Sequence, residues 1–294
     1  MDGVSTEHVR WLAEPELTRP TLLAAFTGWN DAGDSASTAL RTMVESWGAT
    51  PLAEIDPEVF TDFATVRPQV RLDEQHQRSI VWPTVGVWSA SVPGGDLILL
   101  LGPEPALRWR LFTEQVVGIA ERFGSPLALT IGALLADVPH SRPVPLIGTS
   151  SDPSLLERFD LQASQYEGPT GIVGVLQDAL RRNGVPTASL WAAVPGYASQ
   201  VPSPKAAMAL VERACSMLGT PAPIAGLAGA ATEYDARVAA AVGDDDDLAE
   251  YLDRLEQMAD AAAEDDTDDD EPGDAPVDPD ALVEEVERFL RDQD

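Results

Sequence analysis

Three oxygen-bearing side chains lie close together in the turn FTGWNDAGDS, which separates an apolar run from a segment of helical periodicity. Asn30, Asp31 and Asp34 offer the hard oxygen ligands that Mg²⁺ and Ca²⁺ prefer. The same side chains can instead bond to nearby backbone amides and cap the following helix, while Gly28 and Gly33 supply unusual backbone angles. We favour a structural corner or a protein contact, and keep a small-ligand site and a catalytic site as alternatives.

The sequence gives little support for binding of a phosphate or a metal ion by this turn. Asp31 and Asp34 would repel a phosphate, the turn contains no Lys or Arg, and the chain has no G-x-x-x-x-G-K-[ST] motif. The spacing of Asn30, Asp31 and Asp34 matches no known metal-binding loop. We therefore expect no cofactor, with Mg²⁺ on these three side chains as the alternative.

A second group of chemically capable residues follows the apolar run 126–136, in the segment ADVPHSRP. Ligands of open α/β sheets bind beyond the carboxyl ends of the strands. There Asp137, His140 and Arg142 could transfer protons or hold an anion. The alternative is a proline-braced loop in which His140 and Arg142 bond to their neighbours.

Two further candidates lie where helices are expected to begin. Tyr166 belongs to YEGPTG, which leads into a helix with Thr170 as its expected N-cap. Lys205 is the only lysine and follows Pro204 in the first turn of another expected helix. Because cations are disfavoured at a helix N-terminus, we expect Lys205 to pair with a carboxylate, for which Glu104 is one candidate.

Nucleophilic catalysis has no recognisable motif in this chain. There is no G-x-S-x-G, and Cys215, the one cysteine, lies on an apolar helix face where a buried core thiol is expected. Enzymatic activity is therefore left open, with a non-enzymatic protein favoured.

The apolar pattern predicts an α/β fold with a mostly parallel sheet flanked by helices. Uninterrupted apolar runs are typical of strands covered on both faces. Strands are expected at 21–26, 97–102, 126–136 and 189–195, with helices at 36–47, 105–123, 171–183 and 204–218. In residues 60–95 the apolar residues are separated by polar residues and prolines, a pattern that predicts shorter strands or a β extension.

Composition divides the chain into a core and an acidic C-terminal region. We expect the α/β core at 1–243, a helix at 244–260, a disordered acidic linker at 261–279 and a short helix at 280–294. Residues 244–294 contain 23 acidic and 3 basic residues, a net charge of −20 out of −30 for the whole chain. This charge disfavours nucleic acids and anionic membranes as partners. With no apolar run long enough to span a bilayer, we expect a soluble cytoplasmic protein.

Five segments together resemble the actinobacterial branch of the PAC2 (proteasome assembly chaperone 2) family. They are FTGWNDAGDSAS, LGPEPALRWRLF, IGALLADVPHSRPVPLIG, YEGPTGIVGVLQDAL and VPSPKAAMALVE, in this order over roughly residues 20 to 220. The resemblance implies a nucleoside-phosphorylase-like core with a small C-terminal helical region. It implies a protein-binding or assembly-chaperone-like function, possible proteasome-related partners, and no generally established catalysis.

Two departures from the resembled family affect these expectations. The chain ends in Arg291-Asp292-Gln293-Asp294 rather than in the hydrophobic-Tyr-any motif by which such chaperones dock. It also has Gly196 in VPGY where close relatives are expected to have His. The rival function is a small-molecule-binding protein or hydrolase, with its pocket between the turn 27–35 and the loop 137–142. We also expect self-association, with an apolar patch at 81–88.

Overall fold

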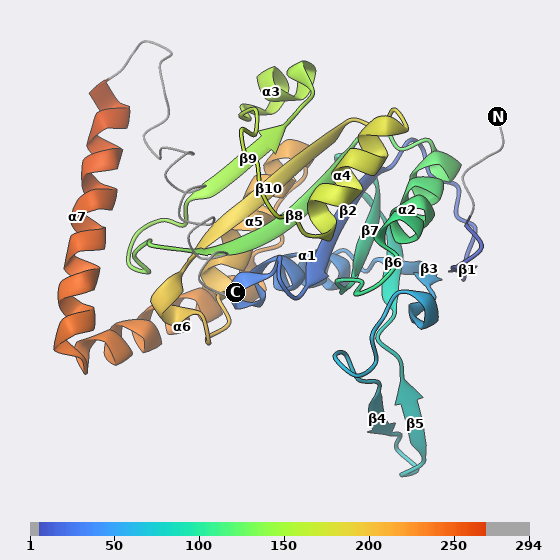
Figure 1. Ribbon diagram of the computed structural model, residues 1–294, viewed down its shortest axis with the longest axis horizontal. Coiled ribbons are helices and arrows are strands. Elements are labelled where there is room, and N and C mark those ends of the chain that lie inside the picture. Colours follow the sequence, from blue (N-terminus) through green and yellow to red (C-terminus); the bar gives the residue numbers. More distant parts are fainter. Residues whose placement is uncertain (1–5, 269–294) are drawn as a thin grey trace.

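The computed structural model describes residues 6–268 and contains an eight-stranded sheet in the order β1-β3-β6-β7-β2-β8-β10-β9 (Figure 1). The central strands β7, β2, β8 and β10 are parallel, and the remaining pairs are antiparallel. The predicted α/β class is thereby confirmed, with antiparallel strands added at both sides of the parallel centre. The strands are β1 (Val9–Trp11), β2 (Thr21–Thr27), β3 (Thr50–Ile55), β6 (Val85–Val92), β7 (Gly95–Pro103), β8 (Ala128–Ala136), β9 (Leu146–Ser150) and β10 (Thr187–Pro195).

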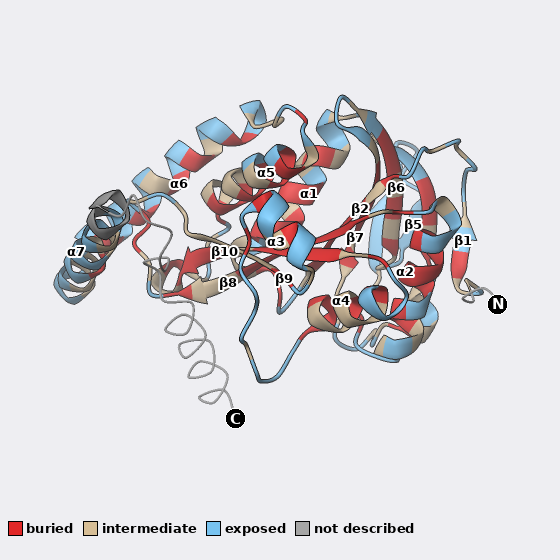
Figure 2. Ribbon diagram, turned by 90° about the horizontal axis from the view of Figure 1, so that it is seen from above, coloured by how far each residue is buried: buried red, intermediate tan, exposed pale blue. Residues whose placement is uncertain are grey.

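Helices cover both faces of this sheet, as the uninterrupted apolar runs predict. Figure 2 shows α1 and α5 on one side of the sheet and α2 and α4 on the other. Helix α6 packs on α5, and α3 packs on the edge strand β9. The helices are α1 (Ser35–Ser46), α2 (Trp109–Phe123), α3 (Pro153–Phe159), α4 (Ile172–Arg182), α5 (Pro204–Leu218), α6 (Ala225–Gly243) and α7 (Asp246–Asp268), with short 3₁₀ turns η1 (Ala32–Asp34), η2 (Pro57–Val59) and η3 (Gly196–Ala198).

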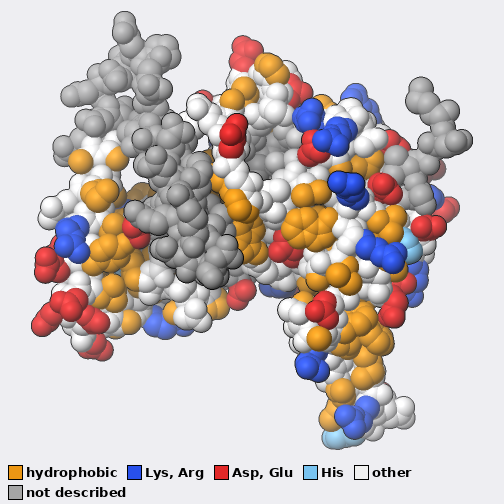
Figure 3. Space-filling view, viewed as in Figure 1, with side chains coloured by type: hydrophobic (Ala, Val, Ile, Leu, Met, Phe, Trp, Pro, Cys, Tyr) orange, Lys and Arg blue, Asp and Glu red, His pale blue; other side chains and the backbone are white. Residues whose placement is uncertain are grey.

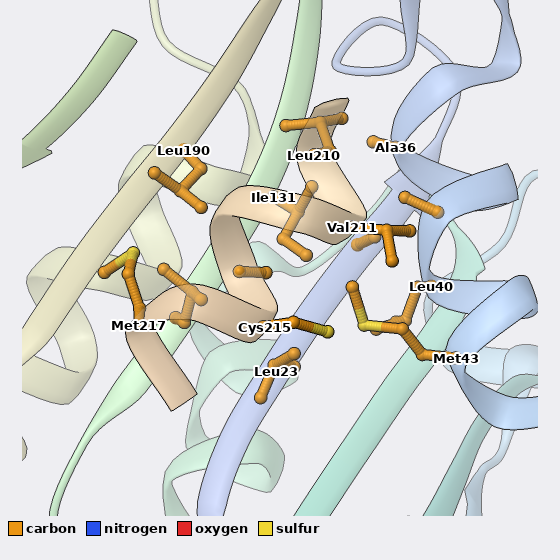
Figure 4. Close-up of a cluster of buried hydrophobic side chains, with 14 of the residues drawn as sticks. Leu23, Ala36, Leu40, Met43, Ile131, Leu190, Leu210, Val211, Cys215 and Met217 are labelled. Atoms are coloured by element: carbon orange, nitrogen blue, oxygen red, sulfur yellow. The ribbon is translucent and has the colours of Figure 1, made fainter. Parts of the chain in front are cut away.

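The sheet separates two hydrophobic cores, one on each face, and strand β2 contributes side chains to both. Leu23 belongs to the cluster beneath α1 and α5, whereas Leu22 and Phe26 belong to the cluster beneath α2 and α4. Cys215 on α5 lies in the first cluster (Figure 4), and burial raises the pKa of its thiol to about 11. Such a thiol is protonated at neutral pH and acts as a core side chain.

Two helices differ from the expected pattern. Helix α2 begins at Trp109 rather than at Pro105, because Arg108 adopts a left-handed conformation and the amides of Ala106 and Leu107 donate to the Phe60 carbonyl. Helix α6 was not predicted, since its alanines and glycines give little contrast between an apolar and a polar face.

The last described helix is longer than expected. Helix α7 runs from Asp246 to Asp268, so residues 261–268 are helical where the acidic linker was predicted to begin. Ala261, Ala262, Ala263 and Glu264 are strong helix formers, which favours continuation of the helix beyond residue 260. The rest of the expected linker, 269–279, and the expected helix at 280–294 lie outside the described residues.

The segment between β3 and β6 confirms the expected β extension. Strands β4 (Gln69–Leu72) and β5 (Arg78–Val81) pair as an antiparallel hairpin. Figure 1 shows this hairpin extending away from the body of the molecule, as a two-stranded sheet of its own.

We predict that a chain ending at residue 243 keeps the sheet and both of its cores. The two large clusters contain no residue beyond Leu227, whereas α7 packs Leu248 and Leu252 on Val238 and Val242 of α6. Removing α7 should therefore lower the free energy of unfolding by about 2 kcal/mol, the scale of burying one or two leucine side chains. Denaturant titration checks this, and loss of a cooperative transition would show that α7 is required for the core.

Candidate functional site

The turn that follows β2 is built by two glycines and a bridge to β8. Gly28 and Gly33 have φ values of +113° and +56°, which other residues adopt only with strain. The Asn30 carbonyl accepts the Ala133 amide at 2.9 Å, and Asp31 forms a parallel bridge with the same residue. The turn thus continues along β8 where β2 has ended.

Asp31 caps helix α1 from three residues before the usual N-cap position. Its Oδ1 accepts the amides of Ala36 at 2.7 Å and Ser37 at 3.0 Å, and the residue is 5% exposed. Burial raises the pKa of this carboxyl group above its ordinary value, while the bonds from Ser37 and Ala36 oppose the shift.

Asp34 does not take the capping role that its sequence position suggested. It is exposed, has a φ of +50°, and its side chain makes no capping bond to α1. Asp34 is the last residue of η1 and occupies the N-cap position of α1 in a left-handed conformation, but the first-turn amides of Ala36 and Ser37 donate to Asp31 instead. The capping expectation therefore fits Asp31 and is wrong for Asp34.

Glu104 joins the turn to the beginning of α4. Its Oε1 accepts the side-chain amide of Asn30 and the backbone amide of Ile172, each at 2.9 Å. Asn30 is fully buried, and a Cβ on Gly171 would lie 2.5 Å from its Oδ1, so Gly171 allows close packing there. A Cβ on Gly28 would meet Glu104 at 3.6 Å, which places that glycine beside the same carboxylate.

The start of α4 corrects one sequence expectation and leaves Tyr166 outside this group. Gly171, and not Thr170, occupies the N-cap position and makes no side-chain bond, and the carboxylate of Glu104 accepts the Ile172 amide at this helix start. Tyr166 donates its hydroxyl to the Pro169 carbonyl at 2.7 Å, within its own loop.

His140 belongs to a second polar group, beyond the carboxyl ends of β8 and β10. The Tyr197 hydroxyl accepts the His140 backbone amide at 2.7 Å and lies 2.9 Å from the His140 Nδ1. Burial lowers the pKa of His140 and raises that of Tyr197 to about 12. Both shifts fit a neutral His140 that carries its proton at Nε2 and accepts a hydrogen bond from the Tyr197 hydroxyl at Nδ1.

Lys205 ties this second group to α6 and not to Glu104. Its Nζ lies 3.0 Å from Asp235 Oδ2 and donates to the His140 carbonyl. The expected pairing with Glu104 is thus wrong, although the expected pairing with a carboxylate holds. The cause is tertiary: α6, which packs on α5, brings Asp235 beside the first turn of α5.

Helix α7 closes over the loop that follows β8. Arg142 makes two bonds to Asp260, at 2.6 and 2.7 Å, and its guanidinium lies 3.5 Å from Glu256. Tyr251 donates its hydroxyl to Asp137. The Arg142 guanidinium lowers the pKa of Asp260. Asp137 and Arg142 are therefore engaged by the acidic helix that the sequence separated from the core.

The two polar groups do not combine into one catalytic constellation. Asn30 and Glu104 bond to each other, His140 bonds to Tyr197, and neither pair bonds to the other. Among residues 6–268, no three His, Cys, Asp or Glu side chains are grouped so as to hold a metal ion. Asn30 Oδ1 and Asp31 Oδ2 are the atoms of the first group that are buried without a hydrogen-bond partner.

Tyr197 and Asp235 are the residues of these groups that sequence reasoning missed. Tyr197 follows the end of β10, which pairs in parallel with β8. The signal that could have identified Tyr197 was therefore its position beyond the carboxyl end of a strand, the same edge of the sheet at which His140 was expected. Asp235 lies in α6, a helix that the sequence pattern did not predict.

We predict that Lys205→Met lowers the free energy of unfolding by about 1–2 kcal/mol, since it leaves the His140 carbonyl and Asp235 without their donor. The Lys205 side chain is 17% exposed. Arg181→Met is the matched control, because the Arg181–Asp178 pair on α4 is 56% and 41% exposed and should change stability by no more than about 0.5 kcal/mol. Equal losses in the two variants, measured by denaturant titration, would contradict the structural role of Lys205.

The described helices also bear on membrane insertion. None of the helices within residues 6–268 combines the length and the apolar character that a bilayer span requires.

Comparison with known proteins places this architecture in a family. The profile of the PAC2 family matches residues 25–242. A PAC2 family protein from Streptomyces avermitilis is 43% identical, with a TM-score of 0.74 over 79% of this chain and 99% of its own. A Mycobacterium tuberculosis protein described as a proteasome-assembly chaperone homologue is 39% identical, with a TM-score of 0.71 over the same shares.

More distant structures share the fold alone. PbaB of Pyrococcus furiosus, described as an archaeal proteasome activator, is 17% identical, with a TM-score of 0.63 over 79% of this chain and 97% of its own. No curated protein matches the chain. The profile match and the two actinobacterial structures establish that this chain belongs to the PAC2 family.

Proposed function

We propose that this chain is a non-enzymatic, protein-binding member of the PAC2 family that acts as an assembly chaperone for proteasome subunits. The observation that carries the proposal is the internal use of its polar candidates. Asp31 caps a helix, Glu104 holds Asn30 and α4, and Lys205 is paired with Asp235. Side chains that are bonded to other parts of the same chain stabilise the fold. Recognition of a protein partner is then a task for the outer surface.

The names of the relatives supply the class of partner. The Mycobacterium tuberculosis relative is described as a proteasome-assembly chaperone homologue. Proteasome subunits are a partner class that an acidic surface can recognise through complementary charge, without a catalytic site.

The experiment mixes the purified chain with α and β proteasome subunits of an actinobacterium. Native gels and peptidase activity follow the appearance of assembled particles over time. We expect the chain to comigrate with an assembly intermediate and to accelerate the appearance of active particles. An unrelated protein of similar negative charge is the control, and neither comigration nor a change in rate would contradict the proposal.

One observation favours the rival, a small-molecule-binding protein with the same fold. The free oxygens of Asn30 and Asp31 are buried beyond the end of β2, at the edge where α/β sheets bind ligands. Thermal melts with nucleosides, each with and without phosphate, test it. A rise in melting temperature that Asn30→Ala abolishes would favour the rival, and unchanged melts would count against it.

A further inference from the structure

Helix α7 lies on the body of the molecule through one of its two faces. Leu248 and Leu252 pack on Val238 and Val242 of α6, and Leu255, nearly one turn further along α7, is 4% exposed. Residues three or four positions apart share a face of a helix, so the three leucines form one stripe. Figure 3 shows acidic side chains at the outer edge of the molecule where α6 meets α7, with hydrophobic side chains toward the body. Helix α7 is therefore amphipathic, with ten acidic residues and one arginine in its sequence.

The face of α7 that carries the leucines also makes polar contacts with the body. Tyr251 donates its hydroxyl to Asp137, and Glu256 accepts a hydrogen bond from the Ser141 hydroxyl. Asp137 and Ser141 belong to the loop 137–142, which Figure 1 shows beside α7. Apolar and polar contacts with the body thus come from one side of the helix.

Arg142 is the residue of this loop that selects carboxylates. Its guanidinium makes two bonds to the Asp260 carboxylate, at 2.6 and 2.7 Å, and lies 3.5 Å from Glu256. Two parallel bonds between a guanidinium and a carboxylate select that group by geometry as well as by charge. Together with the Ser141 hydroxyl, the loop therefore offers donors that match two carboxylates placed four residues apart on a helix.

The loop is also fixed by bonds to the body that do not involve α7. The His140 backbone amide donates to Tyr197, and its carbonyl accepts Lys205, which pairs with Asp235 at 3.0 Å. Because these partners belong to η3, α5 and α6, the surface under α7 is already formed, and another helix can bind it without rearranging it. We call this surface the receiving surface; it consists of Asp137, Ser141, Arg142, Tyr197, Val238 and Val242.

The attachment of α7 to the receiving surface is exchangeable. A two-residue linker, 244–245, joins α6 to α7, and Asp245 caps α7 by accepting the Leu248 amide at 3.1 Å. The cap comes from the linker, so it persists when the helix leaves the body. The side chains of Arg142 and Asp260 are 33% and 54% exposed, and ion pairs at such exposure contribute little to stability. The short linker holds α7 in place by keeping its effective concentration high.

We propose that the receiving surface is a docking site for an acidic amphipathic helix of a partner protein, and that α7 occupies it in cis until that helix displaces it. Ser141 and Arg142 select carboxylates, and Asp137 selects a hydroxyl. Val238 and Val242 receive apolar side chains. Helix α7 carries all of these groups on one face, so its pattern defines the partner: a leucine stripe, a tyrosine and two carboxylates one turn apart. A partner helix that buries more apolar area than α7 overcomes the advantage of the linker. This inference does not depend on the proteasome partner proposed above.

A fluorescent peptide of residues 246–263 is the probe, and fluorescence anisotropy measures its binding to the full chain. In the parent, α7 competes with the peptide for the receiving surface. Leu255→Ser weakens this competitor and should tighten peptide binding by at least about tenfold. Met258→Ser is the matched control, because Met258 lies on the same helix and is 68% exposed; it should change binding by less than about twofold. Circular dichroism melts establish that both variants are folded.

Further variants test the polar contacts. Glu256→Gln with Asp260→Asn leaves the leucine stripe intact, removes both carboxylates of α7, and should tighten peptide binding by about threefold. In the Leu255→Ser chain, Arg142→Met should weaken binding of the peptide by about fivefold. The same Arg142→Met change should have less than about a twofold effect on a peptide that carries Asp260→Ala, since either change alone removes the one interaction. Equal effects on the two peptides would show that Arg142 does not receive the carboxylate of the bound helix.

A cross-link tests whether α7 and the peptide share the receiving surface. A chain with Leu255→Ser, Ser141→Cys and Glu256→Cys can be closed by a short bismaleimide, while the native Cys215 is buried. The closed chain should not bind the peptide, and the same chain before cross-linking should bind it. The proposal would be overturned by absence of binding to the Leu255→Ser chain, by equal tightening in Met258→Ser, by binding to the closed chain, or by equally tight binding of a scrambled peptide.

Sedimentation velocity distinguishes a partner helix from α7 of a second copy. If each α7 lies on its own chain, the peptide should leave the assembly state of the parent unchanged. Breakdown of a parent assembly into smaller species by the peptide would assign the receiving surface to α7 of a second copy and overturn the proposed partner.

Discussion

Glu104→Ala is expected to lower the free energy of unfolding by about 3 kcal/mol, because it leaves two buried donors without an acceptor. Its Oε1 receives both the Asn30 side-chain amide and the Ile172 backbone amide. Asn30 and Ile172 are both 0% exposed, so water cannot replace the lost acceptor without a local rearrangement. The variant also removes a negative charge from the N-terminus of α4.

Two companion variants separate these contributions. Glu104→Gln keeps an acceptor oxygen and loses only the charge, so it should cost about 1 kcal/mol. Glu114→Ala, at an exposed position of α2, should change stability by no more than about 0.5 kcal/mol. Denaturant titration gives the three free energies, and amide exchange should show faster exchange at Ile172 in Glu104→Ala alone. A loss shared by Glu114→Ala, or an unchanged Ile172 amide, would contradict the linking role.

The parts of the fold that were predictable are those in which local pattern and tertiary burial agree. Strands β2 and β8 are covered on both faces, so their side chains are apolar at nearly every position and the runs are visible in the sequence. Strand β9 is an edge strand whose residues Leu146 to Thr149 are only half-buried, and no apolar run marks it. Helix α5 has an N-cap, an N-terminal proline and a C-terminal glycine, and its bounds were predicted closely.

The candidate site likewise has a part that was predictable from local sequence and a part that depends on long-range contacts. The turn 27–35 was identified because its glycines and acidic residues are local signals, and both glycines have positive φ. The partners of Glu104 were not identified, since Asn30 and Ile172 lie 74 and 68 residues away in the chain. The contacts of Arg142 with Asp260 span 118 residues. Charge suggested a carboxylate partner for Lys205 alone, and tertiary packing decides which groups meet.

Asp31→Ala is expected to cost about 3 kcal/mol, more than an ordinary helix cap, because two buried amides lose their acceptor together. The amides are those of Ala36 and Ser37, at 2.7 and 3.0 Å from Oδ1. Asp34→Ala is the matched control within the same turn and should cost less than about 0.5 kcal/mol, since Asp34 is exposed and makes no side-chain bond to α1. A larger loss in Asp34→Ala than in Asp31→Ala would reverse the assignment of the cap.

The raised pKa of Asp31 gives a second, pH-dependent test. A raised pKa means that the folded protein binds the proton more tightly than the unfolded chain does. The contribution of Asp31 to stability should therefore decrease as the pH rises above 3.8, the ordinary value, through the folded-state pKa. Asp31→Asn cannot ionise, so its stability relative to the parent should improve across this window and be constant above it. A difference that is independent of pH, or that changes in the opposite direction, would contradict the raised pKa.

Asp31 could matter either as the cap of α1 or as a metal ligand, and melting temperatures with and without Mg²⁺ distinguish these two roles. As a cap, Asp31 accepts the amides of Ala36 and Ser37 and needs no metal ion. The melting temperatures of the parent, Asp31→Ala and Asp34→Ala should then not change when Mg²⁺ is added. A metal site would stabilise the parent by mass action and lose that effect when a ligand is removed. The free Oδ2 of Asp31 and Oδ1 of Asn30 are the atoms that a metal would use. A Mg²⁺-dependent rise in the parent that is absent from Asp31→Ala would therefore replace the cap with a metal site and place the small-molecule function ahead of the protein-binding one.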